Sequence, residues 1–153
     1  MPILPDFLAE FIETHDEKLR EYYSKTLGTE MLERSKRHIL VKLASHLDFS
    51  EAEQVCANYH HQSGPGKPPT HTVAHLLRAI LVGQMKNLSL RELEIELATK
   101  FLARWFSGYE LFAHTPDHTT LGRFEGWLLL NHRRIYFDTV LKQIEAFFPK
   151  EKD

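Results

Sequence analysis

Several features are missing from this 153-residue sequence, and each absence excludes a class of protein. A single cysteine, Cys56, excludes an internal disulfide and fits a reducing compartment. No apolar run approaches the length of a membrane helix, and the first residues carry acids instead of the basic start of a secretory signal. No glycine-rich phosphate loop, serine elbow or cysteine–histidine nucleophile pair is visible. We therefore expect a cytoplasmic protein that does not contact membranes.

Charge is nearly balanced overall but unevenly distributed along the chain. Residues 1–66 hold 7 Lys and Arg against 11 Asp and Glu, whereas residues 67–134 hold 9 against 6 and also contain five histidines. A local positive excess attracts an anionic partner. The small excess in the middle of the chain therefore favours a partner such as nucleic acid there.

Strand-type alternation is also absent, and helical periodicity runs from residue 4 to residue 148. We expect an all-α fold, with Thr72 as an N-cap and capping boxes at Ser50 with Glu53 and Ser89 with Glu92. Residues 61–69 hold two glycines and three prolines, which cannot propagate a helix. The expected helices cover about 4–26, 31–47, 50–60, 72–85, 89–107 in one or two pieces, 117–131 and 132–148. The expected domains are an acidic helical lobe at 1–61, a linker at 62–71 and a second helical lobe at 72–153.

The stretch HTPDHTTLGRFEGWL, residues 114–128, has an acid and a histidine ahead of a helical pattern. A catalytic role for Asp117 and His118 would need a third partner and a pocket, so we favour an N-cap at Asp117 or Thr119. A helical wheel places Leu121, Phe124 and Leu128 on the inner face. It places Thr119, Gly122, Arg123 and Gly126 on the outer face. Two exposed glycines are costly in a helix unless DNA or another helix approaches the backbone closely.

Other groups of residues have more ordinary interpretations. Cys56, His60, His71 and His75 have a C-x3-H and H-x3-H spacing that would suit zinc, but the two pairs lie on either side of the linker and there is no C-x-x-C knuckle. We therefore expect no metal and no cofactor. Glu92, Glu94 and Glu96 are typical of a solvated helix flank. Trp105 and Phe106 are expected in the core, and Arg133 with Arg134 form a small basic patch suited to phosphates.

Four motifs resemble the N-terminal domain of InsH-like insertion-sequence DDE transposases. They are GKPP at 66–69, LSLRELE at 88–94, RWFSG at 104–108 and PDHTTLGRF at 116–124. They occur in the order found in that family and at about its spacing. The resemblance implies a helix-turn-helix-like domain that binds double-stranded DNA at transposon ends. Together with the basic patch, it predicts DNA contacts at Lys67, Arg91, Arg104, His118, Thr119, Thr120, Arg123, Arg133 and Arg134.

The chain departs from the pattern of this family at two points. Glu125 stands where members often carry a second basic residue, and no strand-rich segment follows before Asp153. We therefore expect recognition of terminal inverted repeats without the DDE catalytic domain, no catalytic residues and no enzymatic activity. Two alternatives stay open: a helical protein–protein interaction module, and a trans-acting inhibitor of transposition. The partner would then be a second copy of this chain or an intact transposase.

Overall fold

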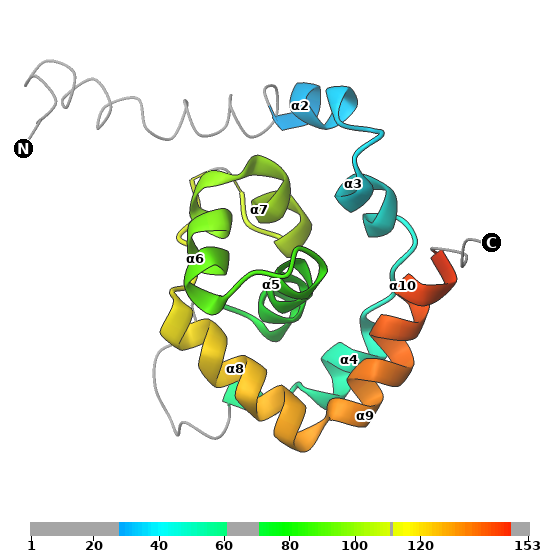
Figure 1. Cartoon of the computed structure of the whole chain (residues 1–153), viewed down its shortest axis with the longest axis vertical. Coiled ribbons are helices and arrows are strands. Elements are labelled where there is room, and N and C mark those ends of the chain that lie inside the picture. Colours follow the sequence, from blue (N-terminus) through cyan, green and yellow to red (C-terminus); the bar gives the residue numbers. More distant parts are fainter. Residues whose placement is uncertain (1–27, 61–70, 111, 148–153) are drawn as a thin grey trace, which may run out of the picture.

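The structure, a computed structural model, describes residues 28–60, 71–110 and 112–147. Every regular element in these ranges is a helix, so the predicted all-α class is confirmed (Figure 1). None of these helices is both long and apolar enough to cross a bilayer. The helix predicted over residues 4–26 and almost all of the predicted linker lie outside the described residues.

In the described residues before position 61 there are three short helices. They are α2 (Gly28–Arg34), α3 (Ile39–Ala44) and α4 (Ser50–Val55). The single helix predicted over 31–47 is wrong, because the chain restarts at His38, whose ring Nδ1 accepts the amide hydrogen of Leu40. The capping box predicted at Ser50 is also wrong. Phe49 is the N-cap residue and makes no side-chain cap bond, while the Ser50 hydroxyl donates to the Asp48 carboxylate.

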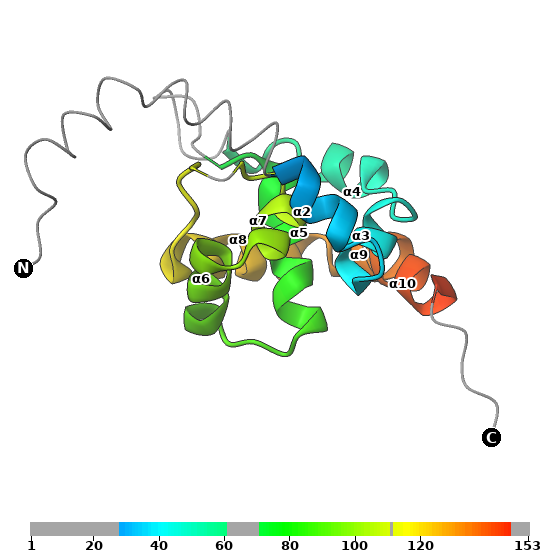
Figure 2. The ribbon, with the colours of Figure 1, turned by 90° about the horizontal axis from the view of Figure 1, so that it is seen from above.

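The central element is α5 (Val73–Met85), which the other helices surround in both views (Figures 1 and 2). Thr72 caps it as predicted, since its hydroxyl oxygen accepts the amide hydrogen of His75 at 3.2 Å. Apolar residues cover most of the helix circumference, and this pattern predicts a buried helix. Its fully buried side chains confirm that prediction: Leu76, Leu77, Ala79, Ile80, Leu81 and Val82.

Helices α6 (Leu90–Thr99) and α7 (Phe101–Ser107) follow α5 as separate elements. The capping box that starts α6 is confirmed: Ser89 accepts from the Glu92 amide, and the Glu92 carboxylate accepts from the Ser89 amide. Gly108 ends α7 in the left-handed region, at a φ of 92°, where glycine has no steric penalty.

The last described elements are α8 (His118–Asn131), α9 (Arg133–Tyr136), a π-helical turn (Phe137–Leu141) and α10 (Lys142–Phe147). These last three segments occupy the region of the helix predicted at 132–148. The buried Tyr136 donates its hydroxyl hydrogen to Gln84 of α5 at 2.6 Å, which fixes this end of the chain to the central helix.

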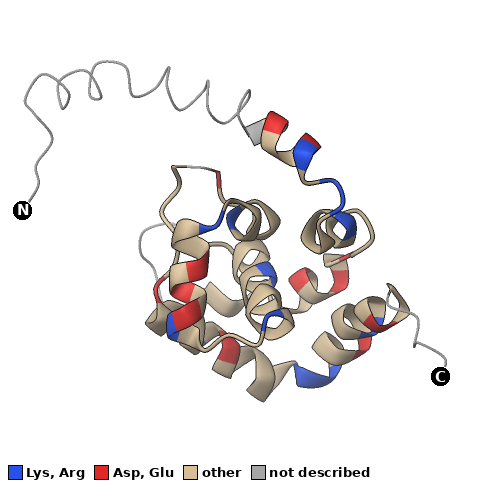
Figure 3. Cartoon of the chain, turned by 45° about the horizontal axis from the view of Figure 1, so that its top comes forward, with Lys and Arg blue, Asp and Glu red and all other residues tan. Residues whose placement is uncertain are grey.

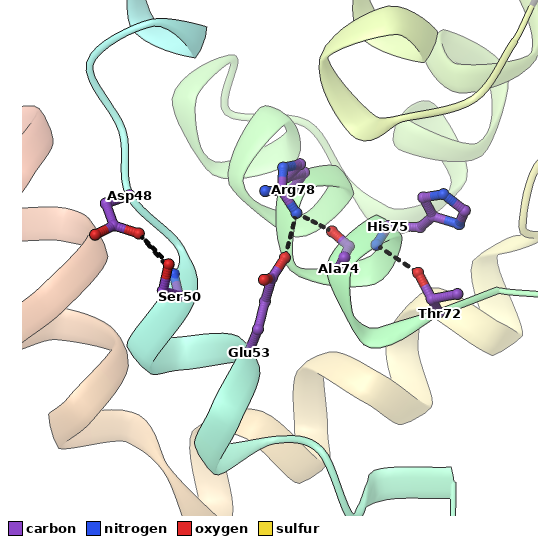
Figure 4. Close-up of polar contacts among 7 residues, drawn as sticks. All are labelled: Asp48, Ser50, Glu53, Thr72, Ala74, His75 and Arg78. Atoms are coloured by element: carbon purple, nitrogen blue, oxygen red, sulfur yellow. Dashed lines mark hydrogen bonds and ion pairs between the residues drawn. The ribbon is translucent and has the colours of Figure 1, made fainter.

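Residues from both sides of the 61–70 segment share one hydrophobic core. Leu43, Phe49 and Ala52 pack in the same cluster as the side chains of α5 and α8. Arg78 of α5 joins α4 to this core, since it donates to Glu53 at 2.7 Å and to the Ala74 carbonyl at 3.0 Å (Figure 4). Its guanidinium also lies 4.4 Å from the centre of the Phe49 ring. The division into lobes at 1–61 and 72–153 stays a prediction about independent folding.

Candidate nucleic-acid interface

The start of α8 is held by two carboxylates that come from different helical segments. Asp117 is the N-cap, as predicted, and its Oδ1 accepts from the Thr120 amide at 2.8 Å. Glu94 of α6 accepts from the His118 amide at 2.6 Å, and the same oxygen lies 2.9 Å from His118 Nδ1. The His118 hydrogen bonds hold the pKa of Glu94 below its usual value, and those of Thr120 do the same for Asp117.

This arrangement decides what the start of α8 can bind. The exposed amides at a helix N-terminus attract anions when nothing else satisfies them. Here Glu94 and Asp117 already complement that end with negative charge. A nucleic acid would therefore be contacted by the side chains of α8 and not by its terminal amides. The Asp117 carboxylate is bonded to the Thr120 amide, whereas the His118 ring is bonded to Glu94.

Two successive contacts lock α8 against α6. Glu94 pairs with His118, and Leu90, four residues earlier, lies against Gly122, four residues later. A Cβ on Gly122 would lie 3.1 Å from Leu90 Cδ1. Of the two expected partners for the Gly122 backbone, DNA or another helix, it is a helix that makes the close approach, namely α6 of this chain, and Gly122 is half-buried. Gly126 has no atom within 4 Å of an ideal Cβ position and is exposed, as predicted.

Three predicted DNA-contacting residues lie exposed beside these contacts: Arg91, Thr119 and Arg123. Arg91 directly follows Leu90 in α6 and Arg123 directly follows Gly122 in α8, so each arginine is the chain neighbour of a residue in this helix–helix contact. Thr119 precedes Arg123 by one turn and shares its side of α8. The inner face is confirmed, because Leu121, Phe124 and Leu128 are fully buried. We call Arg91, Thr119 and Arg123 the α6–α8 face.

The other predicted DNA-contacting residues have different surroundings. Arg133 and Arg134 are exposed in the basic stretch that follows α8, whereas acidic residues gather along α6 (Figure 3). His118 and Thr120 are half-buried, and Lys67 lies outside the described residues.

Arg104 requires a correction. It is only 8% exposed, and its guanidinium donates to the carbonyl oxygens of Leu97, Glu110 and Ala113 at 3.1, 2.9 and 2.6 Å. These bonds tie the end of α6 to the chain that follows α7. Arg104 therefore lies in the interior and does not face a groove.

Three acidic residues of α6 are each engaged by a neighbour. Glu92 caps α6, Glu94 pairs with His118, and Glu96 pairs with Lys86, the C-cap residue of α5. Within the part of the chain that the structure describes, no group of three or more His, Cys, Asp or Glu side chains is placed to hold a metal ion. The core position predicted for Phe106 is confirmed, and Trp105 is half-buried against the core.

The histidines weighed as zinc ligands do gather, but through hydrogen bonds. His60 Nε2 donates to the His71 carbonyl at 2.7 Å, and His71 Nδ1 is 2.8 Å from the Tyr109 hydroxyl. Cys56 lies in the core, where burial raises its pKa to about 11 and disfavours a metal-binding thiolate.

A comparison with known protein families matches residues 29–126 to the transposase domain DUF772. The match covers more than half of the chain and includes α2 to most of α8. The chain belongs to this transposase-domain family. Searches of curated proteins and of solved structures gave no match. The α6–α8 face lies wholly within the transposase domain, whereas Arg133 and Arg134 lie beyond the matched residues.

Sequence reasoning missed the role of Glu94, which it assigned to a solvated flank. The only signal available was the spacing, since Glu94 lies one turn after Leu90 and His118 one turn before Gly122. That signal identifies a contact only when it is known that α6 and α8 pack together at this point.

Proposed function

We propose that this transposase domain binds duplex DNA at the ends of an insertion sequence and recognises the terminal inverted repeats. The observation that carries the proposal is the pair of exposed arginines, Arg91 and Arg123, each next in the chain to a residue of the α6–α8 contact, in a chain of the transposase-domain family. In this proposal the domain corresponds to the N-terminal, helix-turn-helix-like DNA-binding part of an InsH-like transposase.

The rigidity of the α6–α8 face supports recognition of DNA sequence. An arginine placed on a fixed helix presents its planar fork to the O6 and N7 atoms of guanine in the major groove. The Leu90–Gly122 and Glu94–His118 contacts fix the helices that carry Arg91 and Arg123. Thr119 adds a hydroxyl that can donate or accept one turn away, and Gly126 leaves room for a sugar–phosphate backbone.

Phosphate contacts would come from residues around this face. Arg133 and Arg134 follow the end of α8 and would bind the DNA backbone without reading its sequence. Lys67 would act in the same way. His118 and Thr120 would contribute less, because His118 is paired with Glu94 and the Thr120 amide is used by the cap.

We further infer that the described fold binds the ends without cutting them. Cleavage by a two-metal mechanism needs carboxylates that converge on the metals. Around the α6–α8 face, Glu94 and Glu96 are paired with cationic or donor groups of neighbouring helices, and Asp117 is used as a cap. An assay for strand-specific nicks in an end duplex with Mg²⁺ or Mn²⁺ tests this inference. Nicking that is lost when one of these acids is replaced would overturn it.

A second candidate function is binding to another protein helix. Gly126 is open, and Leu130, one turn later on the same side of α8, is 84% exposed. An apolar side chain beside an open glycine suits close helix packing against a second copy or against an intact transposase. In that case the chain would act as a module of assembly or as a trans-acting inhibitor, and its binding to DNA would be weak and unspecific.

The deciding experiment measures binding to a fluorescent duplex that carries the end of the element, beside a scrambled duplex of equal composition. Arg123→Ala and Arg91→Ala should each weaken binding to the end duplex and reduce its preference over the scrambled one. The control is Arg37→Ala, because Arg37 is exposed between α2 and α3, away from α6 and α8 (Figure 1). Equal losses for all three variants, or equal affinity for both duplexes, would reject sequence recognition by the α6–α8 face.

A further inference from the structure

Four histidines from three segments gather at the buried Tyr109, of which His71 and His75 contact the tyrosine directly. His60 follows α4, His71 and His75 flank the start of α5, and His114 precedes α8. Tyr109 itself follows α7. We call these five residues the histidine cluster. It joins segments that are up to 54 residues apart, from His60 to His114.

The contacts within the histidine cluster are specific. His60 donates to the His71 carbonyl, and the His71 ring is hydrogen-bonded to the Tyr109 hydroxyl at 2.8 Å. The rings of His71 and His114 stack at 6.1 Å between centroids, with an interplanar angle of 26°. The rings of His75 and Tyr109 lie 4.5 Å apart.

His75 is packed in a way that suits only a neutral ring. Its Nδ1 is buried and has no hydrogen-bond partner among the described residues. Its ring points away from Glu53 (Figure 4). The ring lies against Gly108, where a Cβ would be 2.8 Å from His75 Cδ2. In a protonated imidazole both nitrogens donate, so a buried Nδ1–H without an acceptor would be strongly unfavourable.

The charges that face the cluster also favour neutral histidines. The positive charge of Arg78, which is paired with Glu53, lowers the pKa of His75. The positive charge of Arg104 lowers the pKa of Tyr109 against the larger effect of burial. The Asp117 carboxylate, which caps α8, has the opposite effect and raises the pKa of His71. Glu110 acts on Arg104 and not on the histidines.

The pKa shifts agree with this packing. Burial lowers the pKa of His71, and the nearby His114, His75 and His60 lower it further against the opposing effect of Asp117. Burial also lowers the pKa of His75, with a smaller contribution from Arg78. Two adjacent histidines that resist protonation in the folded state make this region sensitive to acid.

We propose that the histidine cluster is a proton-operated clasp, which is closed when the imidazoles are neutral and opens when His71 and His75 take up protons. Opening breaks the His71–Tyr109 hydrogen bond and the packing of His75 on Tyr109. It thereby separates the end of α4 and the start of α5 from residues 109–117, which lead into α8. Only two residues lie between His114 and the Asp117 cap, so an open clasp loosens the start of α8. The further expectation that a loosened α8 lowers DNA affinity rests on the proposed DNA-binding function.

The sign of the pH dependence follows from the lowered pKa values. The unfolded chain takes up protons on these two histidines near pH 6.5, whereas the folded chain resists until a lower pH. The stabilising contribution is therefore complete above pH 6.5 and is lost progressively as the pH falls below it. Wild-type protein should lose roughly 5 °C or more in Tm between pH 7.5 and 5.5.

The test compares this loss with that of the double variant His71→Gln, His75→Phe. Glutamine keeps a hydrogen-bonding group beside Tyr109, and phenylalanine keeps a ring there, but neither takes up a proton. The variant should lose less than half as much Tm as the wild type, while His46→Gln, an exposed histidine outside the cluster, should match the wild type. A double variant with the full wild-type loss would overturn the clasp.

A measurement on wild-type protein keeps the proposal testable if the double variant does not fold. Amide exchange at pH 5.5, corrected for intrinsic rates, should increase for residues 71–75 and 109–120 while α9 and α10 keep their protection. A uniform increase over the whole chain would show global unfolding and would overturn a local clasp.

DNA binding separates the two proposals. Protonated histidines in general strengthen binding to DNA, so a several-fold weaker affinity of wild type at pH 5.5, absent in the double variant, supports coupling of the clasp to α8. Affinity that rises equally in both proteins would reject the coupling. Absence of DNA binding at either pH would reject the proposed function, and the clasp would then be judged on Tm and exchange alone.

Discussion

Two arginines of this transposase domain, Arg104 in α7 and Arg123 in α8, show how differently one residue type is used in neighbouring motifs. Both belong to the motifs that indicated a DNA-binding domain, RWFSG and PDHTTLGRF. Arg104 is buried and bound to three carbonyl oxygens, whereas Arg123 is exposed beside the α6–α8 contact. Membership of a motif therefore does not reveal whether a cation supports the fold or faces a partner. The partners of the guanidinium decide it.

The largest expected effect is the loss of stability when Arg104 is replaced. Arg104→Met should reduce the free energy of unfolding by about 2–4 kcal/mol, because it leaves the carbonyls of Leu97, Glu110 and Ala113 without this donor. Urea unfolding monitored by circular dichroism measures it. If the variant keeps its stability but binds DNA less well, Arg104 contacts DNA as Arg123 is proposed to do, and the structural role of Arg104 is wrong.

Arg123→Ala should give the opposite pattern. Binding to an end duplex should weaken by about 1–3 kcal/mol, because one base-reading guanidinium is lost. Stability should change by less than about 0.5 kcal/mol, since the side chain is exposed. Binding titrations at two salt concentrations, beside a melting curve, measure both quantities. A large drop in Tm would show that Arg123 is structural, as Arg104 is.

The comparison also shows what the sequence could provide. The 14-residue helix α8 is long enough for its periodicity to place Leu121 and Phe124 inside and Arg123 outside, and the structure agrees. Helix α7 has only 7 residues, and nearly every one of them is buried or half-buried, so periodicity could not place Arg104. Its role depends on carbonyls up to nine residues away that come together only in the folded chain.

Helix caps that depend on neighbouring residues could also be predicted from the sequence. Thr72, Ser89 and Asp117 act as caps within one turn of chain, as their spacing indicated. Ser50 failed because Asp48, two residues earlier, takes its hydroxyl, and Glu53 is drawn away to Arg78 of another helix. The Glu94–His118 pair and the histidine cluster join residues far apart in the sequence. The sequence alone could show these residues only in separate motifs and could not predict that they contact one another.

Glu94 offers a smaller effect that sharpens the comparison at the start of α8. Glu94→Ala should lower the Tm, because the His118 amide loses its acceptor, whereas Glu94→Gln keeps an oxygen for that amide and should lose less. The pKa of Glu94 is lowered in the folded state. The difference between the wild type and Glu94→Gln should therefore be present near neutral pH and should disappear as the pH falls below about 4.5. A difference that persists at pH 3 would contradict this role of the Glu94 carboxylate.

The smallest effects come from the two glycines of α8, which form a matched pair. Gly126→Ala should stabilise the protein by up to about 1 kcal/mol, because alanine is the better helix former and its Cβ would meet no atom within 4 Å. Gly122→Ala should gain less or nothing, since its Cβ would lie 3.1 Å from the end of the Leu90 side chain, which must shift. Thermal melts of both variants measure this difference. The same variants test the α6–α8 face: if DNA approaches the backbone at Gly126, Gly126→Ala weakens binding to an end duplex although it raises the Tm. A stabilised Gly126→Ala variant with unchanged DNA affinity but impaired self-association would instead favour packing against another helix beside Leu130.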